Sequence, residues 1–278
     1  MTHRSRPWVR LAVSLILAAA LVFFLFPVVW MFLTTFKTQD QIFTTPPVLV
    51  PPAEQWNLNN YVAALTQSGG LQALRDSLIV SGATALVSVV IGSLAAYSLA
   101  RYRTGGDQFA FWILSTRMFP PVASAIPLFL IFRDLKLLDT HWALIIANSI
   151  FTLPFAIWLL KGFIEDLPPE LEESALIDGA SAFQAFWHVT RPLIGPGVVT
   201  ATLFTFVFTW NEFMFALLLT KNRVRPLTVM ISSLAGGHEI LWAQIAASGV
   251  LAIIPGVLLV IFLQRYIVRG LTMGALKY

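Results

Sequence analysis

The sequence predicts an all-α, polytopic membrane protein with six transmembrane helices, and two observations lead to that prediction. First, 57% of the 278 residues are hydrophobic and 12% are charged, which is about half the charged share of a typical soluble domain. Second, the apolar residues gather into six stretches, each close to the roughly 20 residues that a helix needs to cross a bilayer. With a mean hydropathy of +0.77, such a chain would expose too much apolar surface in water.

The first apolar stretch raises the question of a cleaved signal peptide, because it follows a basic start at Arg4, Arg6 and Arg10. Its apolar run is too long for that reading, and no small-residue cleavage site follows it. We therefore expect a retained anchor. The expected spans cover residues 11–36, 77–100, 108–132, 142–160, 192–220 and 240–264.

Lysine and arginine set the expected orientation, because loops on the cytoplasmic side of a membrane protein have an excess of positive charge. The N-terminal arginines and the turn with Arg101 and Arg103 place both termini in the cytoplasm. Residues 1–70 are then an anchor span and an extracytoplasmic loop, residues 71–268 a core with five spans, and residues 269–278 a cytoplasmic tail.

Several functional classes are disfavoured by what the sequence contains. The chain has no cysteine, so thiol nucleophiles and thiolate metal sites are excluded. No lysine follows a glycine, as a phosphate-binding P-loop requires, so we expect no ATP site and no cofactor on this chain. The net charge of +4 comes without a basic run, which argues against nucleic acid. The histidines lie apart and predict neither a metal site nor an enzyme; they are His3, His141, His188 and His238.

The segment between the fourth and fifth expected spans reads as two short helices joined by a bend. Pro168 or Pro169 can open the first helix, and the three glutamates that follow suit the positive end of its dipole. Gly179 can end it in a left-handed conformation. Ser181 and Gln184, three residues apart, match a capping box that starts the second helix.

This segment resembles the coupling segment of binding-protein-dependent ABC importer permeases, whose motif is E-A-A, three residues, G, nine residues, I-x-L-P. Both spacings hold here, with serine for the first alanine and Arg191 for the leucine. The matching residues are Glu173, Ser174, Ala175, Gly179, Val189 and Pro192. The resemblance implies a cytoplasmic coupling helix that seats in a cleft of a separate ATPase subunit through Glu173, Ser174, Ala175, Asp178, Gly179, Ala180 and Pro192.

The resemblance extends over most of the chain and is to the carbohydrate branch, in particular to the six-span subunit of the maltose-type permease pair. It is seen in Phe119-Pro120-Pro121, Pro127-Leu128, residues 137–140, Trp210-Asn211-Glu212-Phe213 and residues 269–277. It implies the type I ABC importer permease fold in a bacterial inner membrane. It also implies a second permease subunit, two ATPase copies that bind ATP and Mg, and an extracytoplasmic solute-binding protein.

Two charged residues lie inside expected spans. Because burying a charge in a membrane is costly, a functional role is the first interpretation of such a residue. For Arg117, structural pairing and a pathway role are equally open; for Glu212, the pathway or gate reading is favoured. Because both spans run outward, the two residues differ in depth by roughly 15 Å, and we expect no direct pair.

Other pathway candidates are prolines, amides and aromatic residues. Pro120, Pro121 and Pro127 are expected to break the third span, which then lines a cavity. Trp210, Asn211, Phe213 and Phe215 suit a hydroxylated ring, although the favoured interpretation is that they pack between helices or lie in the aromatic belt at the membrane surface. The polar candidates in the expected pathway are Asn148, Ser149, Thr152, Thr205 and Thr209.

These residues favour a neutral, hydroxyl-rich solute such as a sugar or polyol, with an amino acid or a glycerol phosphate as the alternative. A secondary carrier coupled to ions is a further alternative. Carriers tend to show inverted repeats and carboxylates near the membrane midplane. This sequence shows no repeat by eye, and its clear intramembrane acid lies off-centre.

Overall fold

The computed structural model describes residues 7–236 and 239–273, which form helices and connecting turns with no strand among them. The chain divides into two compact units, each described separately below. The first unit comprises Met1–Gly70 and Ile231–Ile253, and the second comprises Leu71–Met230 and Ile254–Tyr278. The all-α prediction is confirmed.

Four helices are long and apolar enough to cross a membrane, and two bent helix pairs bring the number to six if each pair is one span. The bent pairs are Gln108–Met118 with Pro121–Asp134, at 86°, and Ala182–Leu193 with Gly195–Trp210, at 78°. The four straight helices are α1 (Pro7–Thr34), α4 (Gly70–Tyr102), α7 (His141–Glu165) and α14 (Trp242–Met273).

In the first unit, close helix packing and hydrogen bonds fix the segment that follows α1. Met31 on α1 lies close to Gly249 on α14. A Cβ added to Gly249 would come within 2.8 Å of the Met31 sulfur. The side-chain amide of Asn60 donates to the carbonyl oxygen of Thr35 over 2.8 Å. Phe23 and Phe24 are 74% and 73% exposed, as suits contact with lipid. The short elements of this unit are α2 (Gln39–Ile42), η1 (Ala53–Gln55), α3 (Asn59–Val62) and η2 (Ala63–Gln67).

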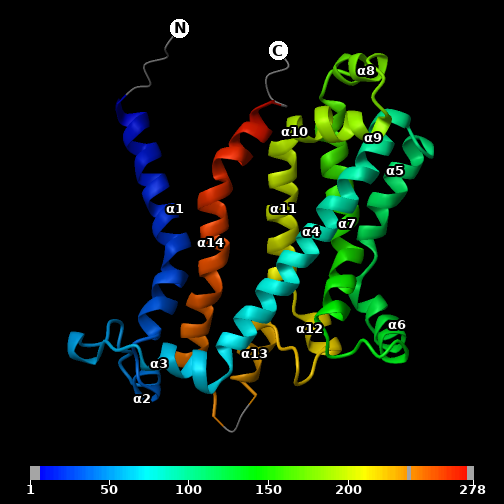
Figure 1. Cartoon of the computed structure of the whole chain (residues 1–278). Helices are drawn as coiled ribbons and strands as arrows, with labels where there is room; N and C mark the ends of the chain where they lie inside the picture. Colours follow the sequence, from blue (N-terminus) through cyan, green and yellow to red (C-terminus); the bar gives the residue numbers. More distant parts are fainter. Residues whose placement is uncertain (1–6, 237–238, 274–278) are drawn as a thin grey trace. The chain divides into compact units, whose positions relative to one another are not determined.

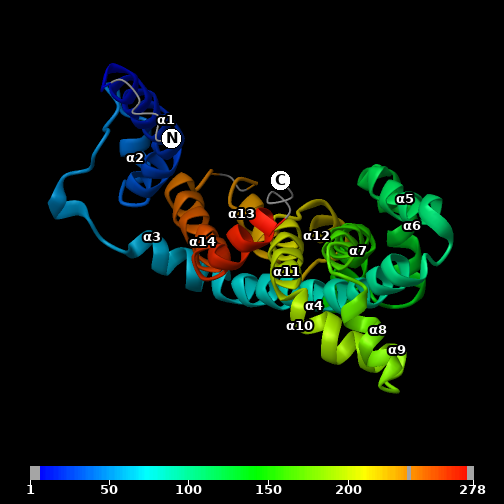
Figure 2. The same ribbon diagram turned by 90° about the horizontal axis from the view of Figure 1, so that it is seen from above.

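The second unit is built around α7, which lies beside α11 in both views (Figures 1 and 2). Small residues let the helices approach closely, since a Cβ on Gly92 of α4 would lie 3.1 Å from the Cβ of Ala156 on α7. The hydroxyls of Ser88 and Thr152 join α4 to α7 over 2.8 Å. The other elements are α5 (Gly106–Ser115), η3 (Thr116–Met118), α6 (Pro121–Asp134), α8 (Glu170–Ile177), α9 (Ala182–Ala185), η4 (Phe186–Thr190), α10 (Arg191–Leu193), α11 (Gly195–Trp210), α12 (Met214–Leu219) and, shared with the first unit, α13 (Leu227–Ser233).

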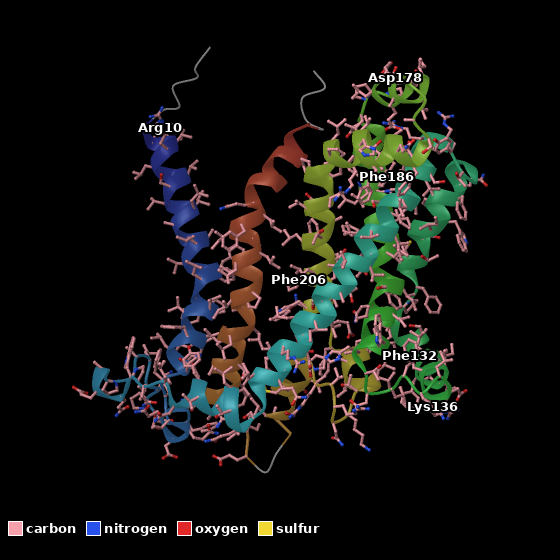
Figure 3. The ribbon with its side chains drawn as sticks, viewed as in Figure 1. Arg10, Phe132, Lys136, Asp178, Phe186 and Phe206 are labelled. Carbon is pink, nitrogen blue, oxygen red and sulfur yellow. The ribbon has the colours of Figure 1, made fainter. Side chains whose placement is uncertain are left out.

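Two apolar clusters stabilise opposite ends of this second unit. Asp178 and Phe186 mark one end, and Phe132 and Lys136 mark the other (Figure 3). At the first end Leu160, Ile164 and Phe186 are buried together with residues of α4 and α11. At the other end Phe132 is buried with residues of α7 and α12. The apolar cluster that contains Phe186 therefore supports the end of the unit that bears α8 and α9.

The expected third and fifth spans are interrupted rather than continuous. The chain bends between η3 and α6 at Phe119 and Pro120, where Pro120 adopts an extended backbone, as predicted. The expected break at Pro127 is wrong, because α6 continues through that residue. A proline removes one helical hydrogen bond, but the bonds on either side of it maintain the helix. The fifth span bends at Ile194, and it stops again at Trp210 before α12 starts at Met214.

Candidate functional site

The predicted coupling segment forms the helix–bend–helix that its sequence predicts, and we call residues 168–193 the coupling module. Pro169 occupies the N-cap position of α8, whose first turn is acidic. Gly179 adopts φ of +92°, in the left-handed region. Its N–H donates to the carbonyl oxygen of Leu176, and that of Ala180 donates to the carbonyl oxygen of Ala175, so two carbonyls in the last turn of α8 are satisfied. The capping box between Ser181 and Gln184 is present in full.

The coupling module is fixed to the membrane helices by a buried ion pair and by aromatic packing. Arg101, in the last turn of α4, donates from Nε to Glu172 over 2.9 Å and from Nη2 to the carbonyl oxygen of Leu167 over 3.1 Å. The two charged side chains are 14% and 6% exposed. The ring of Phe186 lies 5.1 Å from that of Tyr97 on α4. These contacts join α8 and η4 of the coupling module directly to the end of α4.

The outer surface of the coupling module is exposed and partly apolar, with Ile177 exposed by 85%. A protein partner that covers this side chain would gain free energy from burying it. Of the residues that the motif suggests for ATPase docking, five are exposed and two are partly buried. The exposed ones are Glu173, Ser174, Asp178, Gly179 and Pro192, and the partly buried ones are Ala175 and Ala180.

A cavity of about 520 Å³ lies in the second unit, and one face of α7 contributes part of its lining. Asn148, Phe151 and Thr152 follow at helical spacings of three and four residues, so their side chains share one face. The region around the break after α11 completes the lining, together with residues next to the bend before α6. Its further lining residues are Arg117, Pro121, Val122, Phe208, Asn211, Glu212, Phe213, Met214 and Phe215.

Arg117 lines this cavity and has no ion pair within the described residues. Its guanidinium carbon lies 4.6 Å from the centre of the Phe155 ring and 4.5 Å from that of Phe208. Its Nη1 atom is buried and has no hydrogen-bond partner in the described chain. Aromatic faces stabilise a cation, but they satisfy none of its N–H donors.

Glu212 lines the same cavity, but its carboxylate oxygens are occupied. One accepts a hydrogen bond from Phe215 N over 2.7 Å and the other from Ala216 N over 3.0 Å, so the side chain caps α12. Its carbonyl oxygen accepts from the hydroxyl of Thr228 over 2.9 Å. Glu212 thus stabilises the break between α11 and α12, and the described residues hold no ion pair between it and Arg117.

The structure brings four of the six main pathway candidates together and leaves two outside. Arg117, Asn148, Asn211 and Glu212 line the cavity, whereas Pro120 and Trp210 do not. Trp210 is 8% exposed and stacks on a neighbouring ring of α11, which agrees with the packing reading. Of the further polar candidates Thr152 lines the cavity, and Ser149, Thr205 and Thr209 do not.

Sequence reasoning missed the phenylalanines Phe151, Phe155 and Phe208. Their spacing was a usable signal, since Phe151 and Phe155 are four residues apart on one helix, as are Phe204 and Phe208 on another.

At the opposite end from the coupling module, two aspartates hold the connection between α12 and α13. The carboxylate of Asp139 accepts backbone N–H bonds from residues 221–224, at 2.9–3.2 Å. Burial alone would raise the pKa of Asp139, but these four donors outweigh it and lower the pKa to about 2. Asp76 accepts from Arg225 N and from His141, each over 2.9 Å. Both aspartates therefore position this connection.

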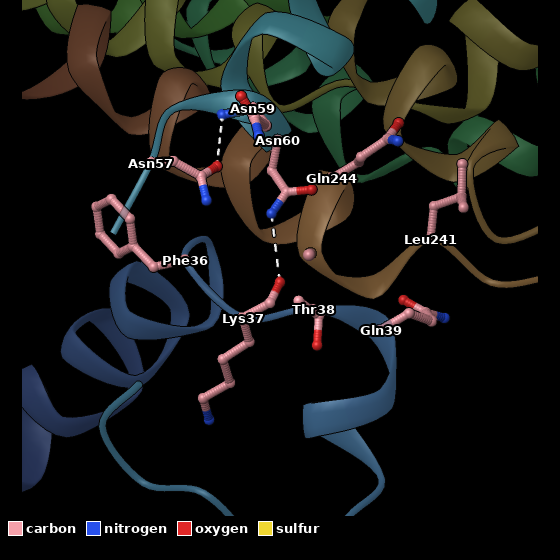
Figure 4. Close-up of a pocket in the computed structure, with 10 residues that line it drawn as sticks. Phe36, Lys37, Thr38, Gln39, Asn57, Asn59, Asn60, Leu241 and Gln244 are labelled. Atoms are coloured by element: carbon pink, nitrogen blue, oxygen red, sulfur yellow. Dashed lines mark hydrogen bonds between the residues drawn. The ribbon is translucent and has the colours of Figure 1, made fainter. Parts of the chain in front are cut away.

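The first unit contains a separate pocket of about 300 Å³ with several amide side chains (Figure 4). Many of these amides hold the chain together: Asn57 accepts from Asn59 N, Asn60 donates to Lys37 O, and Gln244 accepts from Ser68. We therefore regard this pocket as structural.

Comparison with known proteins decides the family. The family described as "Binding-protein-dependent transport system inner membrane component" matches residues 88–273. The chain belongs to this family. It is a multi-pass membrane permease subunit and not an enzyme. Among the described residues no group of histidine, aspartate and glutamate is placed to hold a metal ion.

Family relatives share most of their length with this chain. It is 35% identical to the trehalose/maltose transport system permease protein MalG of Thermococcus litoralis, over 91% of each chain. It is also 35% identical to the sulfoquinovosyl glycerol transport system permease protein SmoH of Agrobacterium fabrum, over 91% of this chain and 89% of the other. The fold matches a bacterial ABC transporter involved in import of the acidic polysaccharide alginate, with a TM-score of 0.77 and 23% identity, over 96% of this chain and 99% of that one.

Proposed function

We propose that this permease subunit forms, with a second permease, the pathway through which an ATP-driven importer moves a sugar or polyol. Two ATPase copies, which bind ATP and Mg, dock on the coupling module. A solute-binding protein delivers the solute to the opposite, extracytoplasmic end. The expected cytoplasmic tail at residues 269–278 lies largely outside the described residues, and it stays a prediction.

The observation that carries this proposal is the exposed coupling module on a rigid base. Gly179 gives the module a sharp bend that a residue with a side chain would adopt at a cost. The Arg101–Glu172 pair connects the module to α4. An ATPase that moves this module would therefore transmit its movement into the membrane helices.

The solute class is supported by the relatives and by the cavity. The names of the relatives above include trehalose, maltose and sulfoquinovosyl glycerol as transported solutes. The cavity combines phenylalanine rings with the amides of Asn148 and Asn211. Aromatic faces and amides suit the apolar faces and hydroxyls of a sugar ring. An amino acid or a glycerol phosphate is the second candidate, because Arg117 and Glu212 also line the cavity.

Uptake by the purified importer in proteoliposomes tests this function. We expect uptake of a sugar or polyol that needs ATP inside and the binding protein outside. The solute is chosen by a thermal-shift screen of that binding protein against sugars, polyols, amino acids and glycerol phosphates. Uptake driven by an ion gradient without ATP would identify an ion-coupled carrier and contradict the proposal.

The proposed orientation has its own test, since the coupling module must face the ATPase. A reporter fused after Arg103 should lie in the cytoplasm, and one fused near Asp139 should lie outside. A cytoplasmic signal from the fusion near Asp139 would contradict this orientation.

A further inference from the structure

The cavity in the second unit contains a cation whose hydrogen-bonding capacity is not used within the described chain. Arg117 Nη1 is buried without an acceptor, and the guanidinium packs against Phe155 and Phe208. A guanidinium presents its donors in one plane, in a fork that matches a carboxylate or a similar anion. A buried donor without an acceptor is costly, and an acceptor brought to the guanidinium removes that cost.

The acidic side chain in the same cavity does not supply that anion. Both oxygens of Glu212 accept backbone N–H bonds from α12, and the described residues show no ion pair between it and Arg117. Glu212 therefore uses its carboxylate to accept hydrogen bonds at the start of α12, whereas Nη1 of Arg117 has no acceptor among the described residues.

The remaining polar groups of the cavity suit hydroxyls. Asn148 and Asn211 each donate through the side-chain nitrogen to a carbonyl four residues earlier in their own helix, at 2.9 and 2.8 Å. No bond to either amide oxygen is found among the described residues, so these oxygens can accept from a sugar. Phe151 and Phe213 line the same space and can cover the apolar face of a sugar ring.

We propose that the cavity takes a sugar bearing an anionic group, a carboxylate or a sulfonate, and that Arg117 is the residue that recognises this group. A carboxylate or sulfonate can accept two parallel N–H bonds from a guanidinium and is also attracted by its opposite charge, so the anionic group gains more from Arg117 than a hydroxyl does. The inference rests on the proposed function, since it concerns which sugars pass through this pathway. It departs from the neutral solute that the sequence alone favours.

The test uses the complete importer in proteoliposomes, with ATP inside and its binding protein outside. The probes are matched pairs of sugars in which a hydroxymethyl group is replaced by a carboxylate, chosen by a thermal-shift screen of the binding protein. We expect the acidic member of a pair to be taken up at least tenfold faster than the neutral one. Arg117→Gln should reduce that ratio at least tenfold, and Arg117→Lys should keep part of it because it retains the charge.

Arg133→Gln is the matched control, because it removes an exposed cation on the neighbouring α6 whose partner is Asp134. It should leave the uptake ratio unchanged. Equal or faster uptake of the neutral sugar by the wild type would overturn the inference, as would an unchanged ratio in Arg117→Gln. If Arg117 instead pairs with an acid of the second permease, Arg117→Gln destabilises the complex and lowers the uptake of both sugars equally, so the ratio stays unchanged, which also overturns the inference. Uptake of an amino acid and of no sugar would contradict the proposed function itself.

Discussion

Arg101 on α4 and Glu172 on α8 form an ion pair of 2.9 Å that is almost closed to solvent. Glu172 lies on α8 of the coupling module and Arg101 in the last turn of α4, and Arg101 also donates to the carbonyl oxygen of Leu167. Because this buried contact joins α8 directly to α4, we expect the two helices to move together.

Glu172→Gln should uncouple α8 from α4 and destabilise the protein. The substitution leaves the Arg101 charge buried without its partner, which costs on the order of 3 kcal/mol. Thermal unfolding of the purified importer checks the stability, and the ratio of solute uptake to ATP hydrolysis checks the coupling. Asp134→Asn removes an exposed pair and should change stability by less than about 1 kcal/mol. Equal effects of the two substitutions would show that the Arg101–Glu172 pair transmits nothing.

Asp139 should make the connection at residues 221–224 sensitive to acid. Its pKa of about 2 in the folded protein lies below the ordinary value near 3.8, so its stabilisation is fully present above about pH 4. That stabilisation is lost as the pH falls from about 4 towards 2, where the carboxylate is protonated. Amide hydrogen exchange, corrected for its intrinsic pH dependence, should show protection of residues 221–224 decline over this range.

The variant Asp139→Asn should lower the protection of these amides at neutral pH, since an amide side chain keeps only one acceptor oxygen. The exposed Asp134→Asn should not. Protection that is the same at about pH 3 and at neutral pH would contradict the anchoring role of Asp139.

Gly197→Ala should loosen the packing of α11 on α7. A Cβ at Gly197 would lie 2.6 Å from the Phe163 ring, so the ring or the helix must shift. Such overpacking typically lowers the free energy of unfolding by about 1–3 kcal/mol. Gly195→Ala is the control, because a Cβ there meets nothing within 4 Å. A melting temperature that falls equally in both variants would count against close packing at Gly197.

The elements with local signals were predictable from the sequence. The coupling module follows from Pro169, the glutamates after it, Gly179 and the Ser181–Gln184 box, because each acts on its own backbone within a few residues. The long apolar helices follow from composition in the same way. The bend next to Pro120 was also predictable, because a proline constrains the residue before it.

The cavity and the anchors depend on contacts between residues far apart in the chain. Nothing near Arg117 in the sequence indicates that Phe155 and Phe208 pack against its guanidinium. Likewise, Asp139 meets residues 221–224 only once α7 and α12 are packed. Pro127 shows that a local signal can also mislead. A proline predicts a break in a helix, but α6 continues through Pro127.

The measurement that tests the central claim most directly is ATP-driven uptake by Gly179→Val beside Gly162→Val. A Cβ at either glycine meets nothing within 4 Å, and only Gly179 has a positive φ, +92°. Valine is strained there and tolerated in the helical backbone of Gly162. If the coupling module receives the force of ATP hydrolysis, Gly179→Val inserts in the membrane but loses ATPase binding and uptake, while Gly162→Val keeps both. Normal assembly and uptake by Gly179→Val would contradict the account.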